Sequence, residues 1–493
     1  MRKILLIIAA TIGAFLLIAT VGLYWFFSGD GMRRALEQQA TSYLGQPVKI
    51  ATARAQLFPR PGIGLSGIEV GQPVQLTLAS VDLSTDLRAL LNRRIEDASI
   101  VISDSRIQMP LPFGIPQSND STKAEPTSQG GGLEVVSVRE ISLRNIRMVS
   151  RGREVRVSAD SSLNGNKLTI ESFTAESGAT SLQAQGEAVL EPSIDAKVKI
   201  KANKVDIDEL LALAEAFTPE QRAARRGGPQ KPMKVNAEIV ADSATAAGLQ
   251  VKQFNARMAL DGDRLVMSPL TFALFGGSYD GSLNARLGDN MSMTLRSHVK
   301  GLDVAQIAAF GGSPDTISGA LDGDVTFNAQ GADMAAALAS ANGKGAVSIV
   351  DGTVKRLDLV RTVVLFFGRP APDTAAASDQ FERIDATFSL AKQVFRADTF
   401  AMRSRDADLD GSATLALDSK TLDGTVDMKL SEELTAQAGR DLARYTREQD
   451  RVVLPARISG TLEQPRITIN AVAALRRGIQ NEIGERLKGL FGK

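Results

Sequence analysis

The 493-residue sequence contains no cysteine and one histidine, His298. The lack of cysteine excludes disulfides, thiol nucleophiles and cysteine-ligated metal sites. A single histidine cannot build a zinc site of the usual kind. A chain without cysteine is suited to an oxidising compartment such as a periplasm. We therefore expect no metal site and no cofactor.

Other catalytic signatures are missing as well. The sequence has no G-x-S-x-G, Walker or H-E-x-x-H motif. The segment Gly62-Ile-Gly-Leu-Ser-Gly67 matches G-x-G-x-x-G, but it follows Pro-Arg-Pro and leads into a predicted strand, so it does not indicate dinucleotide binding. With 57 basic and 56 acidic residues, the charge does not favour a nucleic-acid partner. We predict that the protein is not an enzyme and binds no nucleic acid.

An uncharged apolar run, residues 4–27, follows a short basic tip at residues 1–3. As a helix it would span about 36 Å at about 1.5 Å per residue, enough for a hydrocarbon core of about 30 Å. The alternative is a cleaved signal peptide, but the run exceeds the usual apolar region of about 7–15 residues and no good cleavage site follows it. We predict an uncleaved transmembrane helix.

The next block, residues 28–116, is predicted to mix one helix with several strands. Met32 to Leu44 alternates polar and apolar residues with helical spacing. Extended segments are expected at 48–58, 63–71, 74–82 and 95–107. Residues 117–132 contain no large apolar side chain and read as a flexible linker.

Strand patterns dominate residues 133–470. The clearest, Ile194-Asp-Ala-Lys-Val-Lys-Ile-Lys-Ala202, places apolar residues on one face and charged residues on the other. Val426-Asp-Met-Lys-Leu430 repeats this pattern. His298 lies in a similar strand and is predicted to be a surface residue. One-faced strands of this kind belong to a largely antiparallel sheet with one wet face.

The strand region contains internal repeats. Leu163-Asn-Gly165 resembles Leu260-Asp-Gly262, 97 residues further on, and another copy begins near Leu390. Asp206 and Asp303, also 97 residues apart, each precede a short predicted helix, as capping residues do. Repeats of this length indicate stacked units that bury their apolar faces on one another.

Two further helices are expected near the C-terminus. The polar segment 432–450 reads as one, and residues 471–493 read as an amphipathic helix with basic flanks. Its apolar stripe either binds a membrane surface or caps the last strands. The candidate membrane-surface residues are Leu475, Ile479, Ile483, Leu487 and Phe491.

The few short helices cannot cover so many one-faced strands, so the sheet either curls over itself or leaves apolar surface open. An open apolar face marks a ligand or partner site. A continuous apolar groove suits lipid acyl chains, because burial of each CH₂ group contributes about 0.8 kcal/mol. The candidate groove residues are Ile194, Val198, Ile200, Ile239 and Met428.

Segments at both ends of the chain carry a family resemblance. An N-terminal anchor precedes Leu44-Gly-Gln-Pro-Val48 and Leu57-Phe-Pro-Arg-Pro-Gly-Ile-Gly-Leu65. Near the C-terminus, Leu454-Pro-Ala-Arg-Ile-Ser-Gly-Thr-Leu-Glu-Gln-Pro-Arg-Ile467 contains an I-x-G-T-x-x-x-P segment. With these features the chain resembles the AsmA family of bacterial inner-membrane-anchored envelope proteins, which includes TamB-like members.

The resemblance implies a mostly β fold: an N-terminal transmembrane helix, then an elongated, curved, largely antiparallel repeat sheet with an apolar groove. It implies an anchor in the inner membrane, the bulk of the chain in the periplasm, and a role in phospholipid transport or lipid homeostasis between the two membranes. Acyl chains are the expected ligand, and the outer membrane or an envelope protein is a further candidate partner for the C-terminal end. The alternatives are an assembly factor for outer-membrane proteins and a structural envelope scaffold.

Overall fold

The computed structural model forms two compact units, Met1–Gly248 and Leu249–Lys493. It describes residues 30–56, 60–86, 94–109, 134–217, 233–246, 248–288, 290–332, 334–355, 359–366, 380–437, 447–448, 451–470, 472–474 and 476. The predicted anchor and linker lie outside these ranges, as does most of the predicted C-terminal helix. No helix within these ranges is both long and apolar enough to cross a membrane. The unit boundary falls inside the predicted 133–470 region, and the predicted domain limits stay predictions.

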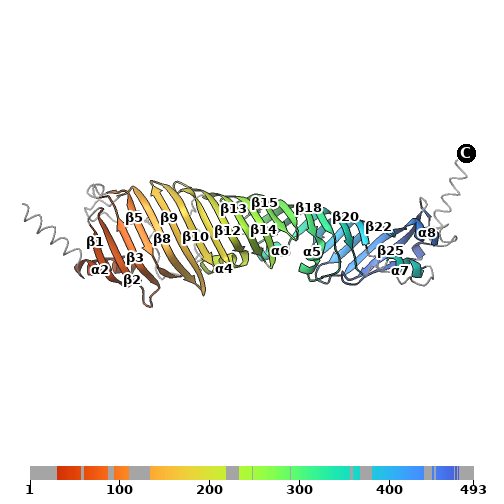
Figure 1. Cartoon of the computed structure of the whole chain (residues 1–493), viewed down its shortest axis with the longest axis horizontal. Coiled ribbons are helices and arrows are strands. Elements are labelled where there is room, and N and C mark those ends of the chain that lie inside the picture. Colours follow the sequence, from red (N-terminus) through yellow and green to blue (C-terminus); the bar gives the residue numbers. More distant parts are fainter. Residues whose placement is uncertain are drawn as a thin grey trace, which may run out of the picture. The chain divides into compact units, whose positions relative to one another are not determined.

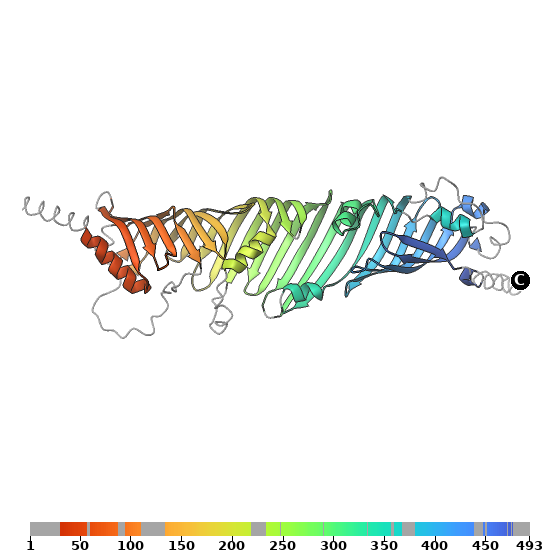
Figure 2. The same cartoon turned by 90° about the horizontal axis from the view of Figure 1, so that it is seen from below.

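Unit 1 is a twisted sheet with two helices among its described residues (Figures 1 and 2). Its elements are α2 (Asp30–Leu44), β1 (Val48–Gln56), β2 (Gly62–Val70), β3 (Leu76–Ser84), β4 (Arg94–Ile95), β5 (Ala98–Ser103), β6 (Arg106–Met109), β7 (Glu134–Val135), β8 (Ser137–Ser150), β9 (Arg153–Asn164), β10 (Lys167–Ser177), β11 (Thr180–Val189), β12 (Ile194–Asp206), α4 (Ile207–Phe217) and β13 (Met233–Ala246).

Most neighbouring strands of unit 1 are antiparallel and adjacent in sequence. The antiparallel pairs run from β1 to β3 and from β8 to β12, and β3 also pairs with β5 and β6. Parallel pairs join β5 and β6 to β8, β4 to β7, and β12 to β13. The prediction of a largely antiparallel sheet is confirmed, while these parallel pairs were not predicted.

Helix α2 confirms the predicted amphipathic helix and covers the first strands. Its residues Leu36, Ala40 and Leu44 pack against the buried cluster formed by β1, β2 and β3. The Glu37 carboxylate accepts hydrogen bonds from Arg33 at 2.9 Å and from the backbone N–H of Ile50 at 2.8 Å. The bond from Ile50 fixes the helix to β1, whereas the bond from Arg33 lies within the helix.

Helix α4 crosses from the end of β12 toward the β8–β9 turn (Figure 2). Its first turn is capped by Asp206, which accepts a hydrogen bond from the N–H of Glu209 at 3.0 Å. Glu209 also pairs with Arg153 at 2.5 Å, and Ser150 donates to the carbonyl of Ala216 at 2.6 Å. The helix thus joins strands that lie several places apart in the sheet.

Unit 2 has the same construction. Its elements are β14 (Leu249–Asp261), β15 (Arg264–Leu274), β16 (Gly277–Arg286), β17 (Met291–Asp303), α5 (Val304–Phe310), β18 (Ala320–Gly331), α6 (Met334–Ala339), β19 (Asn342–Thr353), α7 (Leu359–Phe366), β20 (Gln380–Ala391), β21 (Val394–Arg403), β22 (Ala407–Ala416), β23 (Leu422–Leu430), α8 (Glu432–Gln437), β24 (Arg447–Glu448), β25 (Arg451–Gly460) and β26 (Pro465–Ile469).

The predicted repeats correspond to four strands followed by a short helix. The module occurs as β9–β12 with α4, as β14–β17 with α5, and as β20–β23 with α8. The helix starts are capped in the same manner. Asp303 accepts a hydrogen bond from Ala305 N–H at 2.9 Å, and Ser431 accepts one from Leu434 N–H at 3.2 Å. The turn glycines Gly165 and Gly262 both have φ near +60°, which L side chains avoid.

The C-terminal part of unit 2 closes into a core. Side chains from β20 to β26 pack together with Leu359 and Val363 of α7 and with Leu434 of α8. Leu409, Met428 and Leu454 are at most 1% exposed. This part of the sheet therefore curls over its own apolar face, one of the two outcomes that the sequence allowed.

Two predicted elements were wrong in extent. The strand predicted at 95–107 is broken at Asp97 and Asp104, whose positive φ values of 52° and 48° end β4 and β5. The polar helix predicted at 432–450 ends as α8 at Gln437 in the described residues, and 447–448 form β24, paired with β25. In both places a turn or a strand pairing overrides a local pattern.

Candidate functional site: an apolar sheet face

The first candidate surface lies on β10 to β13 of unit 1. In β12 the exposure alternates as predicted, with Asp195, Lys197, Lys199 and Lys201 exposed and the intervening residues half-buried or buried. The strand register places Val198 beside Gly186 of β11 and Ala237 of β13. Ile170 of β10 continues this row beside Gly186. The neighbouring rows add Phe173, Leu182, Ala184, Ile194, Ile200 and Ile239. We call this set the β10–β13 apolar face.

On this face the large apolar side chains are more exposed than the small ones. Val198, Ile200 and Ile239 are half-buried, whereas Ala196 and Ala237 are buried. A covering layer would bury the large side chains most completely, because they project furthest from the sheet. Here the large side chains are instead the more exposed ones, because the alanines are shielded by their neighbours while the tips of the larger residues contact solvent. The middle of this face therefore has no complete second layer among the described residues.

A similar surface occurs on β15 to β19 of unit 2. Met267, Leu283, Leu295 and Phe327 form one cross-strand row, and each is half-buried. We call this row and its neighbours Met293, Val325 and Val347 the β15–β19 apolar face. Beside it, Phe254, Phe272 and Tyr279 stack on a small buried cluster.

Two glycines on the same face lie close to aromatic rings. A Cβ atom on Gly343 would lie 2.5 Å from the Phe327 ring, and one on Gly345 would lie 3.1 Å from the Phe388 ring. The absence of a side chain leaves room for each ring beside the glycine of the neighbouring strand.

A separate apolar hollow opens at the end of β2, β3 and β5 in unit 1. It has a volume of about 430 Å³, and Ile63, Leu83, Ile95 and Ile100 contribute to its wall. Leu83 is 39% exposed. Almost all of its lining surface is apolar, so it suits a hydrocarbon group and no charged one.

The opposite, wet face of the sheet is charged and paired in places. Hydrogen bonds from Ser142 and Ser172 lower the pKa of Asp160. Partial burial opposes ionisation of Asp410, but hydrogen bonds and attraction from Arg403, at 2.6 Å, and Lys429 outweigh burial and lower its pKa. His298 is exposed on β17, as predicted, and its Nδ1 lies 2.9 Å from Asp324. In the residues that the structure describes, acidic and histidine side chains form no metal-binding cluster.

Comparison of the sequence with models of known protein families gives a match. The sequence model of the AsmA family matches residues 136–400, more than half of the chain. The chain belongs to the AsmA family. AsmA proteins are envelope-associated and are not known as enzymes. No curated protein and no solved structure matches this AsmA-family chain.

The structure brings together four of the five predicted groove residues of this AsmA protein. Ile194, Val198, Ile200 and Ile239 share one face of two adjacent strands. Met428 is separate: it is fully buried between Leu409 and Leu454 in the closed core of unit 2. It therefore lines no open surface, because the sheet curls over it.

The remaining predicted site residues lie outside the described part of the chain, which contains only residues 472–474 and 476 of the C-terminal segment. They are Leu475, Ile479, Ile483, Leu487 and Phe491.

Sequence reasoning missed the β15–β19 apolar face and the hollow at Ile63. The alternation Met291-Ser-Met-Thr-Leu295 resembles that of β12 and was a usable signal for the first. The hollow forms where the ends of three paired strands meet, and no local sequence pattern predicts it.

Proposed function

We propose that this AsmA-family protein handles lipids in the bacterial envelope, with acyl chains resting on the β10–β13 and β15–β19 apolar faces. In this proposal residues 4–27 anchor the chain in the inner membrane, and the rest lies in the periplasm and assists phospholipid transport between the membranes. The supporting observation is the half-exposed state of the large apolar side chains on both faces.

The chemistry of these faces suits hydrocarbon. Val198, Ile200 and Ile239 offer surface without a polar group at their tips, and each acyl CH₂ group removed from water contributes about 0.8 kcal/mol. No precise polar contact is required, which fits a surface that must hold chains of varied length. Head groups would remain in water at the strand ends.

The residues of the wet face provide matched controls. Lys197 and Lys199 alternate with Val198 along β12 and are exposed on the other side of the sheet. A photo-crosslinking residue at Ile194, Val198 or Ile239 should capture lipid, whereas one at Lys197 or Lys199 should not. In unit 2, Leu283 and Leu295 are the corresponding test positions, and Asn284 and Thr294 are their controls.

A charge on the apolar face supplies a second test. Val198→Asp places a carboxylate where an acyl chain would desolvate it, at a cost of several kcal/mol. We expect full-length Val198→Asp protein to copurify with less lipid, measured by mass spectrometry, while Lys199→Asp retains the wild-type amount. Equal lipid crosslinking at the apolar-face and wet-face positions, or no lipid crosslinking at either, would remove the basis of the proposal.

A further inference from the structure

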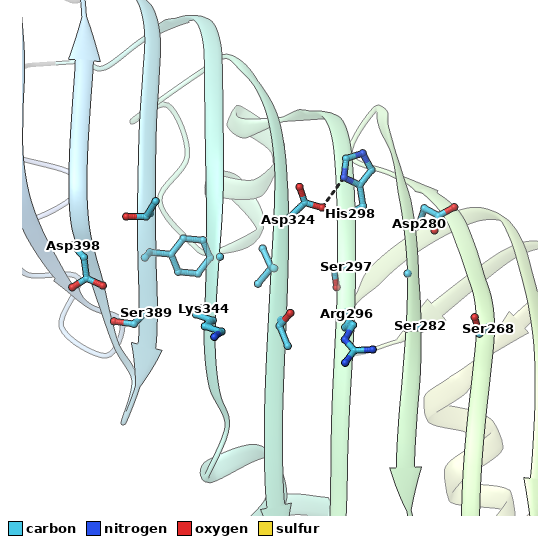
Figure 3. A pocket seen from close by; sticks show the side chains of 16 residues that line it. Ser268, Asp280, Ser282, Arg296, Ser297, His298, Asp324, Lys344, Ser389 and Asp398 are labelled. Carbon is cyan, nitrogen blue, oxygen red and sulfur yellow. Dashed lines mark hydrogen bonds and ion pairs between the residues drawn. The ribbon is translucent and has the colours of Figure 1, made fainter.

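The wet face of unit 2 contains a hollow that the lipid proposal does not use. It spans β15 to β21, has a volume of about 850 Å³, and its wall includes Arg296, His298, Asp324, Lys344 and Asp398 (Figure 3). These charged side chains lie on the face opposite to Leu295 and Phe327. The charged side chains therefore lie apart from both apolar faces, although the wall of the hollow also includes Val325 of the β15–β19 apolar face.

Strand register arranges the cations of this surface in one row. Arg296 of β17, Lys344 of β19 and Arg396 of β21 lie on alternate strands. The strands before and between them present only hydroxyl side chains in that row, namely Ser282, Thr326 and Ser389. Short hydroxyl residues leave space above the sheet and supply further hydrogen-bond donors.

A second row, two residues along each strand, carries the opposite charge. Asp280 of β16 and Asp324 of β18 flank His298 of β17, and Asp398 of β21 ends the row at a bulge. Two residues of a strand span about 6.6–6.8 Å. Figure 3 shows Arg296 and Lys344 on one side of the hollow and Asp280 and Asp324 on the other.

The cations of the hollow are unpaired, in contrast to others on the same face. Arg403 pairs with Asp410 at 2.6 Å and Arg457 with Asp423 at 2.8 Å. In the described part of the chain, Arg296 and Lys344 make no ion pair or side-chain hydrogen bond. The same holds there for Asp280 and Asp398. The hollow thus presents separated positive and negative groups that a bound molecule can satisfy.

We propose that this hollow binds a zwitterionic ligand that carries a phosphate or carboxylate close to an ammonium group. The anionic group meets Arg296 and Lys344, aided by the hydroxyls of Ser282 and Thr326. The ammonium group meets Asp280 and the carboxylate of Asp324, which it shares with His298 at 2.9 Å. A purely anionic ligand gains only the contacts with the cationic row and is repelled by the acidic row. A purely cationic ligand gains only the contacts with the acidic row and is repelled by Arg296 and Lys344.

Calorimetric titration of the full-length protein in detergent tests this assignment with three soluble probes. Glycerophosphoethanolamine carries both charges, glycerol 3-phosphate only the anion, and ethanolamine only the cation. We expect the first to bind at least about tenfold more tightly than either of the others, since a hydrogen bond to a charged group is among the stronger ones.

Variants then separate the two rows. The double variant Arg296→Gln/Lys344→Gln should weaken glycerophosphoethanolamine binding about tenfold or more and abolish any binding of glycerol 3-phosphate. Asp280→Asn/Asp324→Asn should weaken glycerophosphoethanolamine but strengthen glycerol 3-phosphate. Lys199→Gln, an exposed lysine of β12 in unit 1, is the control and should change neither.

The source of the zwitterion is resolved with the full-length protein reconstituted in phosphatidylglycerol vesicles with or without added phosphatidylethanolamine, where binding of phosphatidylethanolamine is measured as competition against glycerophosphoethanolamine. Retention of phosphatidylethanolamine binding in the Val198→Asp variant, and its loss in Arg296→Gln/Lys344→Gln, assigns a lipid head group. Binding of the soluble probe without competition from phosphatidylethanolamine assigns a free solute. Equal affinity for all three probes, or affinity unchanged in both double variants, overturns the proposal and leaves the lipid function of the apolar faces untouched.

Discussion

Val198 and Met428 allow a direct comparison of an open and a closed apolar face. Both lie on strands with the same alternation of apolar and charged residues. The Cα partners of Val198 are Gly186 and Ala237, so small residues flank it on both sides. Met428 lies between Leu409 and Leu454, and all three are at most 1% exposed. Truncation of the two side chains should therefore have unequal effects.

The magnitudes follow from burial. Met428→Ala leaves a cavity in a closed core, which typically lowers the free energy of unfolding by about 2–5 kcal/mol. Val198→Ala removes two carbon atoms, worth about 1.6 kcal/mol if they were fully buried. Since Val198 is only half-buried, we expect a loss of about 1 kcal/mol or less.

The assay must report on each unit by itself, because a chain of two units need not unfold in one step. Hydrogen exchange followed by mass spectrometry at increasing urea concentration gives separate unfolding free energies for β12 and β23. Met428→Leu, which preserves volume, should cost less than about 1.5 kcal/mol and serves as the control. Similar losses for Val198→Ala in β12 and Met428→Ala in β23 would refute the distinction between open and closed faces.

Two further predictions concern unit 2. Gly345→Val would place a Cβ atom 2.4 Å from the carbonyl oxygen of Asp324 and 3.1 Å from the Phe388 ring. We expect thermal unfolding to show a free energy of unfolding that is lower by about 1–3 kcal/mol. The control is Ala346→Val on the exposed face, and a tolerated Gly345→Val together with a damaging Ala346→Val would contradict the prediction. The pKa of Asp410 is lowered in the folded protein, so its ionised form stabilises the fold at pH values above the unfolded-state pKa of about 3.9. This contribution is lost as the pH falls through the lower folded-state pKa. Urea midpoints between pH 7 and pH 3 should therefore fall more for the wild type than for Asp410→Asn, and parallel curves would exclude the contribution.

Sequence patterns captured the elements whose causes are local. The face of β12 follows from strict alternation of its own residues, and the starts of α4 and α5 follow from Asp206 and Asp303, which cap the helix directly after them. The repeated modules were visible because the same turns and caps recur at fixed spacing. Each of these features is decided within a few residues.

Features that depend on distant partners were not predictable in this manner. Met428 has the same neighbours in sequence as an open-face residue, but the curl of β20 to β26 and the position of α7 bury it. The pairing of β24 with β25 replaces the end of a predicted helix. The two charged rows around Arg296 and Asp324 exist only because strand register aligns residues that lie about 20 to 50 positions apart.

The nearest-neighbour pairing within each unit has a consequence for how the chain folds. From β8 to β12, and again from β14 to β23, every strand pairs with the strand before it. Most of these steps close a short loop on an existing edge, so little chain entropy is lost; the connections from β17 to β20 are longer and include α5, α6 and α7. A sheet of this kind can grow strand by strand from its N-terminal side as the polypeptide emerges, in the manner of repeat proteins. Delivery of the chain from its N-terminal end during synthesis would then set the order of assembly.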